Sequence, residues 1–368
     1  MEIETQKCLQ MGEDLITEIL LRLPAKSLVR FKAVCKLWRS LISDPHFATS
    51  HFERAARAHR LLFTTPNGIR TMDLEGSLNP DRISETIYYD FLSTHDDYDF
   101  LSTPIRIEGS FRGFLLVNCN ESLYLWNPSI RVHKPIPSSS LVDSTTNVFY
   151  HLYGFGYDSS NDDYLLVQVP ITDTSSPTDL SYVQFFSLRA NMWKYTQGVD
   201  LPSLTTIELS AGLLFNEAIH WKAWNWNWVA GSVKYFIIAF DLMEKRLLEI
   251  PQPHGLLPHD FGSFTLWVHG RFFSLSVLLG DTIEIWVMKK YKIQSSWTKT
   301  LVLSSKTLFP LCSTKGGDIV MFSGTNLTKY SDEGVPGEQL EYCDHFGFLN
   351  SSVPLYTESM LSLPDVCG

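Results

Sequence analysis

The chain has 368 residues, of which 44% are hydrophobic and 19% are charged, and its formal net charge is −10. This balance is typical of a folded globular protein and excludes a largely disordered chain. The charge is uneven, because residues 1–60 carry 10 Lys and Arg against 7 Asp and Glu, whereas the remainder carries 20 against 33. Nucleic-acid binding needs a basic surface, so the acidic remainder argues against DNA or RNA as its ligand.

Neither membrane-spanning nor secretory segments are expected. There is no run of roughly 18 apolar residues, and the first ten residues, MEIETQKCLQ, are polar, so we expect neither a membrane span nor a secretory signal. The six cysteines are scattered and form no CxxC pair. These features predict a protein of a reducing compartment, the cytoplasm or the nucleus, without metal or cofactor.

Residues 12–58 have the pattern of several short helices that follow a loose tail over residues 1–11. Apolar residues recur at helical spacing in the first of them, namely Leu15, Ile16, Ile19, Leu20 and Leu23. Asp14 has the side chain of a helix N-cap, and Pro24 cannot continue a helical hydrogen-bond ladder. The sequence therefore predicts a first helix between these two residues.

Three further amphipathic stretches follow. Their apolar positions are Leu28, Phe31, Val34 and Cys35 in the second, and Trp38, Leu41 and Ile42 in the third. Asp44-Pro45 predicts the start of a fourth helix, with Asp44 as its N-cap, that runs to about Ala58. Cys35 lies in an apolar stretch, which indicates a packed cysteine and not an activated thiolate.

The apolar residues of this segment are more numerous than a unit of its size can bury alone. They either form the core of a small helical domain or provide a docking face for another protein, and the pattern alone leaves both readings open.

The dispersed motif of the segment resembles the F-box. The matching positions are Leu15-Ile16-x-x-Ile19-Leu20-x-x-Leu23-Pro24, Ser27-Leu28-x-x-Phe31, Val34-Cys35-Lys36, Trp38 and Leu41-Ile42. Met11-Gly12 stand where many F-boxes have Leu-Pro. The resemblance implies docking to the Skp adaptor, and through it to the cullin scaffold, of an SCF ubiquitin ligase. The positions that it assigns to the adaptor interface or the module core are Leu15, Ile16, Ile19, Leu20, Leu23, Pro24, Leu28, Val34, Cys35, Trp38, Leu41 and Ile42.

From residue 59 to residue 368 the sequence is typical of β-structure. A hairpin is predicted around Pro66-Asn67-Gly68, and short apolar runs separated by polar turns then recur. The landmarks of these units lie roughly 45–60 residues apart, in the range of propeller blades; they are Trp126, Phe186, Phe240 and Trp286. We therefore expect an irregular β-propeller, with a pair of β-sandwiches as the alternative. The acidic stretch Tyr88–Phe100 is expected to be an exposed loop, with a calcium site as a remote alternative.

Several phrases of this region resemble the F-box-associated interaction domain of plant F-box proteins, in the kelch-like branch that includes the S-locus F-box type. They include LYLWNPSIRVHKPIP, YGFGYDSSNDDYLLVQV, FSLRANMWK and IIAFDLMEKRLLEIP. The two resemblances together imply an α+β multidomain protein with a small all-α F-box module and a large all-β, kelch-like propeller domain.

Catalytic signatures are weak. His254, His259 and His269 lack metal-ligand spacing, and no GxSxG, Rossmann or phosphate-loop motif occurs. The segment HWKAWNWNW places Trp224, Trp226 and Trp228 on one face of a predicted strand. These tryptophans either pack in the core or form an aromatic platform for a target.

Two functions are consistent with these features. The favoured one is a non-catalytic receptor subunit whose F-box docks the Skp adaptor while the β domain binds an unknown target protein for ubiquitination. The alternative is a β-propeller enzyme, or a carbohydrate- or peptide-binding protein, whose N-terminal helices are purely structural.

Overall fold

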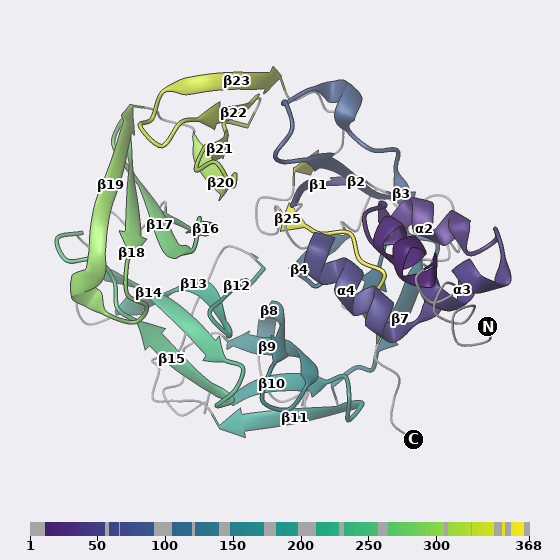
Figure 1. Ribbon diagram of the computed structural model, residues 1–368. Coiled ribbons are helices and arrows are strands. Elements are labelled where there is room, and N and C mark those ends of the chain that lie inside the picture. Colours follow the sequence, from purple (N-terminus) through teal and green to yellow (C-terminus); the bar gives the residue numbers. More distant parts are fainter. Residues whose placement is uncertain are drawn as a thin grey trace.

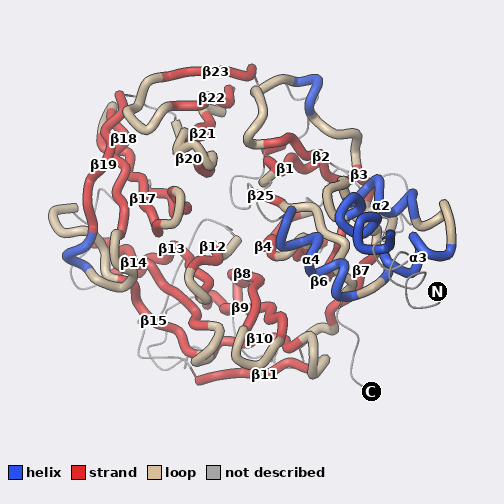
Figure 2. The backbone as a smooth tube through the Cα atoms, in the orientation of Figure 1, coloured by secondary structure: helices blue, strands red, loops and turns tan. Residues whose placement is uncertain are grey.

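The computed structural model is a ring of β-sheets with a cluster of helices at one side (Figures 1 and 2). The residues that it describes are 12–55, 59–65, 67–91, 105–119, 122–139, 148–172, 182–197, 211–227, 232–256, 264–304, 308–324, 326–341, 348–349 and 355–363. None of the helices within these ranges is long and apolar enough to cross a membrane.

The helical module contains a first helix over residues 12–20, followed by α2 (Ala25–Phe31), α3 (Lys36–Ser43) and α4 (Pro45–Ala55). Asp44 is the N-cap of α4 as predicted, because its Oδ1 accepts hydrogen bonds from the backbone N–H groups of His46 (2.7 Å) and Phe47 (3.3 Å). The prediction for Asp14 is wrong. The helix already includes residue 12, so Asp14 lies in the first turn, where its negative charge still favours the helix N-terminus.

Six antiparallel sheets form the ring, and we number them as blades in chain order. Blade 1 combines strands from the beginning and the end of the β domain. Its strand order is β24 (Phe348–Leu349), β1 (Arg60–Thr65), β2 (Gly68–Asp73) and β3 (Ile87–Tyr88), and β25 (Leu355–Tyr356) also pairs with β1. Blade 2 contains β4 (Arg106–Phe111), β5 (Phe114–Cys119), β6 (Ser122–Asn127) and β7 (Val132–Ile136). Blade 3 contains β8 (Val148–Asp158), β9 (Asp163–Thr172), β10 (Tyr182–Ser187) and β11 (Met192–Gln197).

The second half of the ring follows the same order. Blade 4 contains β12 (Leu213–Phe215), β13 (Ala218–Asn227), β14 (Ser232–Asp241) and β15 (Arg246–Ile250). Blade 5 contains β16 (Phe264–His269), β17 (Phe272–Leu279), β18 (Thr282–Met288) and β19 (Trp297–Ser304). Blade 6 contains β20 (Phe309–Ser313), β21 (Ile319–Phe322), β22 (Asn326–Tyr330) and β23 (Pro336–Glu341).

The hydrophobic core is divided between the blades. One buried cluster lies between each pair of neighbouring blades around the ring, and a seventh lies inside the helical module. The landmarks Trp126, Phe186, Phe240 and Trp286 all lie on third strands, in β6, β10, β14 and β18. The structure therefore confirms the propeller and contradicts the sandwich alternative. The hairpin of β1 and β2 is also confirmed, with Thr65 opposite Gly68.

The antiparallel order gives each blade two ends. Turns between first and second strands, and between third and fourth strands, lie at the end that we call the helix-side rim. At this rim the Arg112 guanidinium, in the turn between β4 and β5, lies 5.6 Å from the centroid of the Phe52 ring in α4. Turns between second and third strands lie at the opposite end, the far rim. The helical module therefore covers the helix-side rim over blades 1 and 2 (Figure 1).

Candidate functional site

The twelve F-box positions fall into two groups according to burial. Leu20, Leu28 and Ile42 are at most 1% exposed and form the module core, with Ile16, Leu23, Trp38 and Leu41 packed partly against them. Leu15 (64% exposed), Ile19 (60%) and Val34 (59%) point outward, and Pro24 and Cys35 are also exposed. The outward group is available to a partner protein, whereas the core group stabilises the module itself.

Two further apolar side chains, Val29 and Leu37, are 40% and 36% exposed and were missed by the motif. Five of the fourteen exposed large hydrophobic side chains among the described residues thus lie between residues 15 and 37. We call Leu15, Ile19, Val29, Val34 and Leu37 the outward apolar set. Such a concentration on a small module is typical of a protein interaction surface. Val29 follows the buried Leu28 and so lies about 100° away from it around α2, a rotation that does not by itself predict exposure.

Cys35 differs from its prediction. It is exposed and not packed, and it is the N-cap residue of α3, where its sulfur accepts a hydrogen bond from the Trp38 backbone N–H at 3.5 Å. A helix start leaves unpaired N–H groups that a side-chain acceptor can satisfy, so the position serves the helix end.

Polar contacts hold the module in shape. His51 is 2% exposed, and its Nε2 lies 2.9 Å from the carbonyl oxygen of Leu23, which ties α4 to the end of the first helix. Arg54 donates two hydrogen bonds to Glu18, at 3.0 and 3.2 Å, and this pairing lowers the pKa of the Glu18 carboxyl. The Trp38 ring meets Phe31 edge to face at 5.2 Å. These contacts fix the helices from which the outward apolar set projects.

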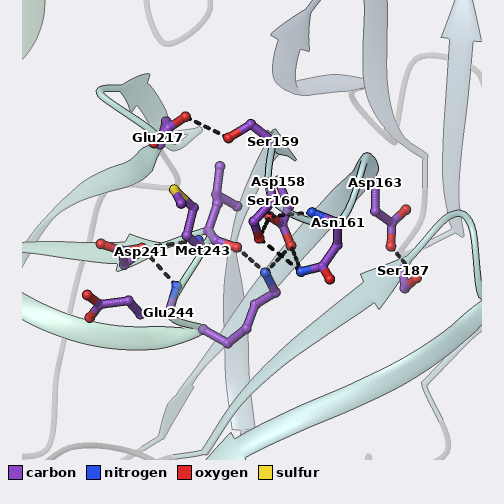
Figure 3. A network of polar contacts seen from close by, with 12 residues as sticks. Asp158, Ser159, Ser160, Asn161, Asp163, Ser187, Glu217, Asp241, Met243 and Glu244 are labelled. Atoms are coloured by element: carbon purple, nitrogen blue, oxygen red, sulfur yellow. Dashed lines mark hydrogen bonds and ion pairs between the residues drawn. The ribbon is translucent and has the colours of Figure 1, made fainter.

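A polar network at the helix-side rim joins blades 3 and 4 (Figure 3). Asp158 is 1% exposed and accepts hydrogen bonds from Ser160, Asn161 and the Lys245 ammonium group. Burial opposes ionisation of Asp158, but these hydrogen bonds and the Lys245 charge outweigh it and hold its pKa well below the usual range.

The same network lines a groove of about 520 Å³. Asp163 in this groove accepts bonds from the Ser187 hydroxyl and the Arg189 backbone N–H. Asp158 of blade 3 accepts a hydrogen bond from the Lys245 ammonium group of blade 4, so the network clamps the two blades together.

The tryptophans of the HWKAWNWNW segment lie on β13 and beyond it. Trp224 is opposite Tyr235 in the register, is half-buried, and its Nε1 is inaccessible. Its strand face also carries His220 and Lys222, which contact Phe273 and Phe264 of blade 5, so Trp224 lies on the side of blade 4 that faces blade 5. The backbone of Trp226 pairs with Val233, but its side chain and the whole of Trp228 lie outside the described residues. The aromatic platform stays a prediction.

The remaining candidates for chemistry are dispersed. His254 is exposed, His269 stacks on Trp267, and His259 lies outside the described residues. Most of the acidic stretch predicted to be an exposed loop, with a calcium site as a remote alternative, also lies outside them. Its start differs from the prediction, because Tyr88 belongs to β3 and Tyr89 is 4% exposed. Within the described ranges no group of three or more His, Cys, Asp or Glu residues could hold a metal ion.

A small helical module with outward apolar residues on a propeller is the architecture of an interaction protein. Comparison with known proteins assigns its family: residues 79–327 match the F-box associated beta propeller domain, and residues 8–49 match the F-box domain. The chain belongs to the F-box proteins that carry an F-box associated beta propeller domain.

Its relatives include F-box proteins of Arabidopsis thaliana. The F-box/kelch-repeat protein At3g23880 is 29% identical over 329 residues, which cover 86% of each chain. The F-box protein CPR1 is 29% identical over 79% of this chain and 72% of its own, and the F-box protein At5g49610 is 26% identical over 85% and 86%. The resemblance to plant F-box proteins is therefore confirmed.

Proposed function

We propose that the chain is the substrate-recognition subunit of an SCF-type ubiquitin ligase. The F-box docks the Skp adaptor, which connects it to the cullin scaffold, and the propeller binds the protein to be ubiquitinated. The observation that carries this proposal is the outward apolar set on the F-box helices, which the module leaves uncovered. A compartment with these ligase subunits, cytoplasm or nucleus, is expected.

In this role the chain brings the target protein close to the site of ubiquitin transfer. Holding a target close to the site of ubiquitin transfer converts a bimolecular encounter into an intramolecular one, and the chemistry is performed by other subunits. No residue of this chain then needs to be catalytic.

The test places a charge on the proposed docking face. Ile19→Asp puts a carboxylate on a side chain that is 60% exposed, so the helices should still fold while burial of that carboxylate against an apolar partner becomes costly. We expect at least a tenfold loss of affinity for a purified Skp adaptor, measured by calorimetry or co-elution. Leu23→Asp would be less informative, because Leu23 packs partly into the module core.

The matched control is Val302→Asp. Val302 is 52% exposed on β19, the outer strand of blade 5. The Val302→Asp variant should therefore bind the adaptor like the wild type. Failure of the wild-type chain to bind any Skp adaptor would refute the proposal. It would favour the alternative of a propeller-based binding protein or enzyme with structural helices.

We propose that the surface that meets the target includes Trp224, Trp226 and Trp228. The backbone of the first two belongs to β13, which ends at the far rim. The far rim is the end of the propeller away from the F-box, so a target bound there and an adaptor on the helices would not collide. Replacing Trp226 and Trp228 by Ala and comparing the proteins captured with and without proteasome inhibition tests this assignment.

A further inference from the structure

The last described segment of the chain, residues 355–363, runs from blade 1 across the helix-side rim to blade 2 and beneath the F-box helices (Figure 1, yellow). We call it the C-terminal strap. We infer that the strap is a positioning element that fixes the orientation of the F-box relative to the propeller, and so the distance between adaptor and target.

The strap begins as part of blade 1. Its first residues form β25, in which Leu355 lies opposite Leu61 and Tyr356 opposite Arg60. Tyr356 is 2% exposed, and its hydroxyl lies 2.7 Å from the Ser129 hydroxyl of blade 2. The strap is therefore attached to two blades before it reaches the helices.

Blade 2 binds the strap through hydrogen bonds from the turn after β6. The Asn127 side-chain amide donates to the carbonyl oxygens of Ser359 (3.1 Å) and Leu361 (2.9 Å), and the Ser359 N–H donates to the Ser129 hydroxyl at 3.1 Å. Asn127 and Ser359 are both fully buried. Gly113 has φ +81°, and a Cβ at this position would lie 2.0 Å from the Ser359 Cβ, so the strap passes where only a glycine leaves room.

The next residue of the strap, Met360, packs into the core of the F-box. Met360 is 4% exposed and belongs to the F-box core cluster, together with Leu20, Leu28, Ile42 and Phe47. Leu361 packs against both this cluster and the one between blades 2 and 3. The core of the F-box is thus completed by a side chain from the end of the propeller.

Among the described residues, further contacts between the module and the propeller involve more exposed side chains. The Lys26–Glu85 ion pair, at 3.3 Å, joins side chains that are 67% and 90% exposed, and such pairs contribute little. Arg112 lies over the edge of α4 at Phe52, and Ile130 of blade 2 packs partly against the F-box core. The strap, in contrast, buries the Met360 side chain in the F-box core, and the strap backbone is hydrogen-bonded to blade 2.

The positioning function of the strap rests on the proposed role of the chain as a ligase subunit. If the adaptor is held by the F-box and the target by the propeller, a rigid joint defines which lysines come within reach of the transferred ubiquitin. A loose joint would spread the modification over more positions and reduce its rate at each.

The main variant is Asn127→Asp. It keeps the acceptor oxygen that caps the Ser129 N–H at 3.0 Å but replaces the amide donor by a carboxylate that faces two carbonyl oxygens. Asn191→Asp is the matched control, because Asn191 lies in the equivalent turn of blade 3, is exposed and does not touch the strap. Met360→Ala is the second variant, which removes the anchor in the F-box and leaves blade 2 intact.

The measurement is the distribution of distances between fluorescent labels placed at Ser50 in α4 and at Ser304 in β19, both exposed, on the full chain. We expect at least a twofold wider distribution in Asn127→Asp and Met360→Ala, and a wild-type distribution in Asn191→Asp. Widths equal to wild type in both strap variants would overturn the inference. If one variant unfolds, the other decides.

A second readout separates positioning from folding. In a ligase reconstituted with a Skp adaptor, the lysines of the chain that are ubiquitinated should form a restricted set in wild type and a broader set in the strap variants. An unchanged set in variants with wider distance distributions would overturn the positioning role. Failure of even wild type to assemble a ligase would refute the proposed function, while the distance measurement would still decide whether the strap fixes the joint.

Discussion

His220 lies on β13 between blades 4 and 5, and the cost of charging it there should couple the stability of the propeller to pH. It is 1% exposed, with Nε2 2.7 Å from the Tyr291 hydroxyl and Nδ1 3.1 Å from the Leu213 carbonyl oxygen. Burial lowers its pKa to about 4, helped by the nearby Lys292 charge and opposed by backbone hydrogen bonds.

The sign of the effect follows from which state binds the proton. Below pH 6.5 the unfolded chain protonates this histidine, whereas the folded chain does not until about pH 4. The free energy of unfolding should therefore fall on going from pH 7 to pH 5, by about 2 kcal/mol from this residue. Urea titrations at the two pH values check this, and His220→Gln should remove that part of the loss. An equal loss in the variant would show that other groups carry it.

The Asp158–Lys245 pair gives a second prediction at the scale of residues. Asp158→Asn would leave the Lys245 ammonium partly buried without its counter-charge, and breaking such a pair should cost about 3 kcal/mol of unfolding free energy. Thermal and urea unfolding measure the change. Glu244→Gln in the neighbouring turn, where the acid is exposed, should cost less than about 0.5 kcal/mol. Similar losses in both variants would contradict the assigned role of the buried pair.

At the scale of elements, a five-residue turn recurs after the third strand of blades 2 to 5. It begins at Asn127, Ser187, Asp241 and Met288, and four residues later it ends at a residue with positive φ, namely Arg131, Asn191, Lys245 and Lys292. In each turn an atom of the first side chain accepts a hydrogen bond from a backbone N–H two to four residues ahead. The four turns share geometry and not residue identity, so no common sequence pattern predicts them.

The hairpin between β12 and β13 predicts how substitutions at Glu217 change the stability of the propeller. Its two central residues, Asn216 and Glu217, have φ +47° and +59°, which is the type I′ geometry that favours Asn-Gly. Glu217→Gly should raise the unfolding free energy by about 0.5–1 kcal/mol, since glycine relieves the left-handed strain of a residue with a Cβ. Glu217→Val, measured in the same unfolding assay, should be destabilising. Destabilisation by glycine would mean that the Glu217 contact with Ser159, at 2.8 Å, outweighs the strain.

The elements that sequence reasoning located best were those with strong local signals. Asp44-Pro45 predicted the start of α4 because both residues act within one turn. Trp126, Phe186 and Phe240 marked third strands because each is buried, and Trp286, which is only partly buried, marked the third strand of blade 5. The burial of individual F-box residues could not be predicted in this way. Leu20 and Ile19 are adjacent and equally apolar, yet their exposed fractions are 0% and 60%, since only one of them faces the other helices.

At the scale of the whole molecule, the ring is closed by segments that are about 290 residues apart in sequence. β1 pairs with β24 through Phe63–Leu349 and with β25 through Leu61–Leu355, so blade 1 contains both ends of the β domain. Sequence reasoning could not predict the closure, because β24 and β25 have two residues each and carry no pattern of their own.

Truncation tests the closure. Removing residues 342–368 should leave Leu61 and Phe63 without their neighbours and Leu20 without Met360, so we expect a loss of more than about 4 kcal/mol in unfolding free energy or an unfolded chain. Circular dichroism and the hydrodynamic radius measure the outcome. Removal of residues 364–368 alone is the control and should have little effect. Equal stability of both truncated chains would contradict the closing role of β24, β25 and the strap.

The position of Met360 also has a consequence for protein synthesis. The F-box leaves the ribosome before the strap does, but one side chain of its core, Met360, belongs to the strap. Domains generally fold as they emerge, N-terminal first. Here the F-box core and blade 1 both need residues 355–363, so a nascent chain that stops before them presents an unfinished F-box. Completion of the F-box core thereby becomes coupled to synthesis of the strap.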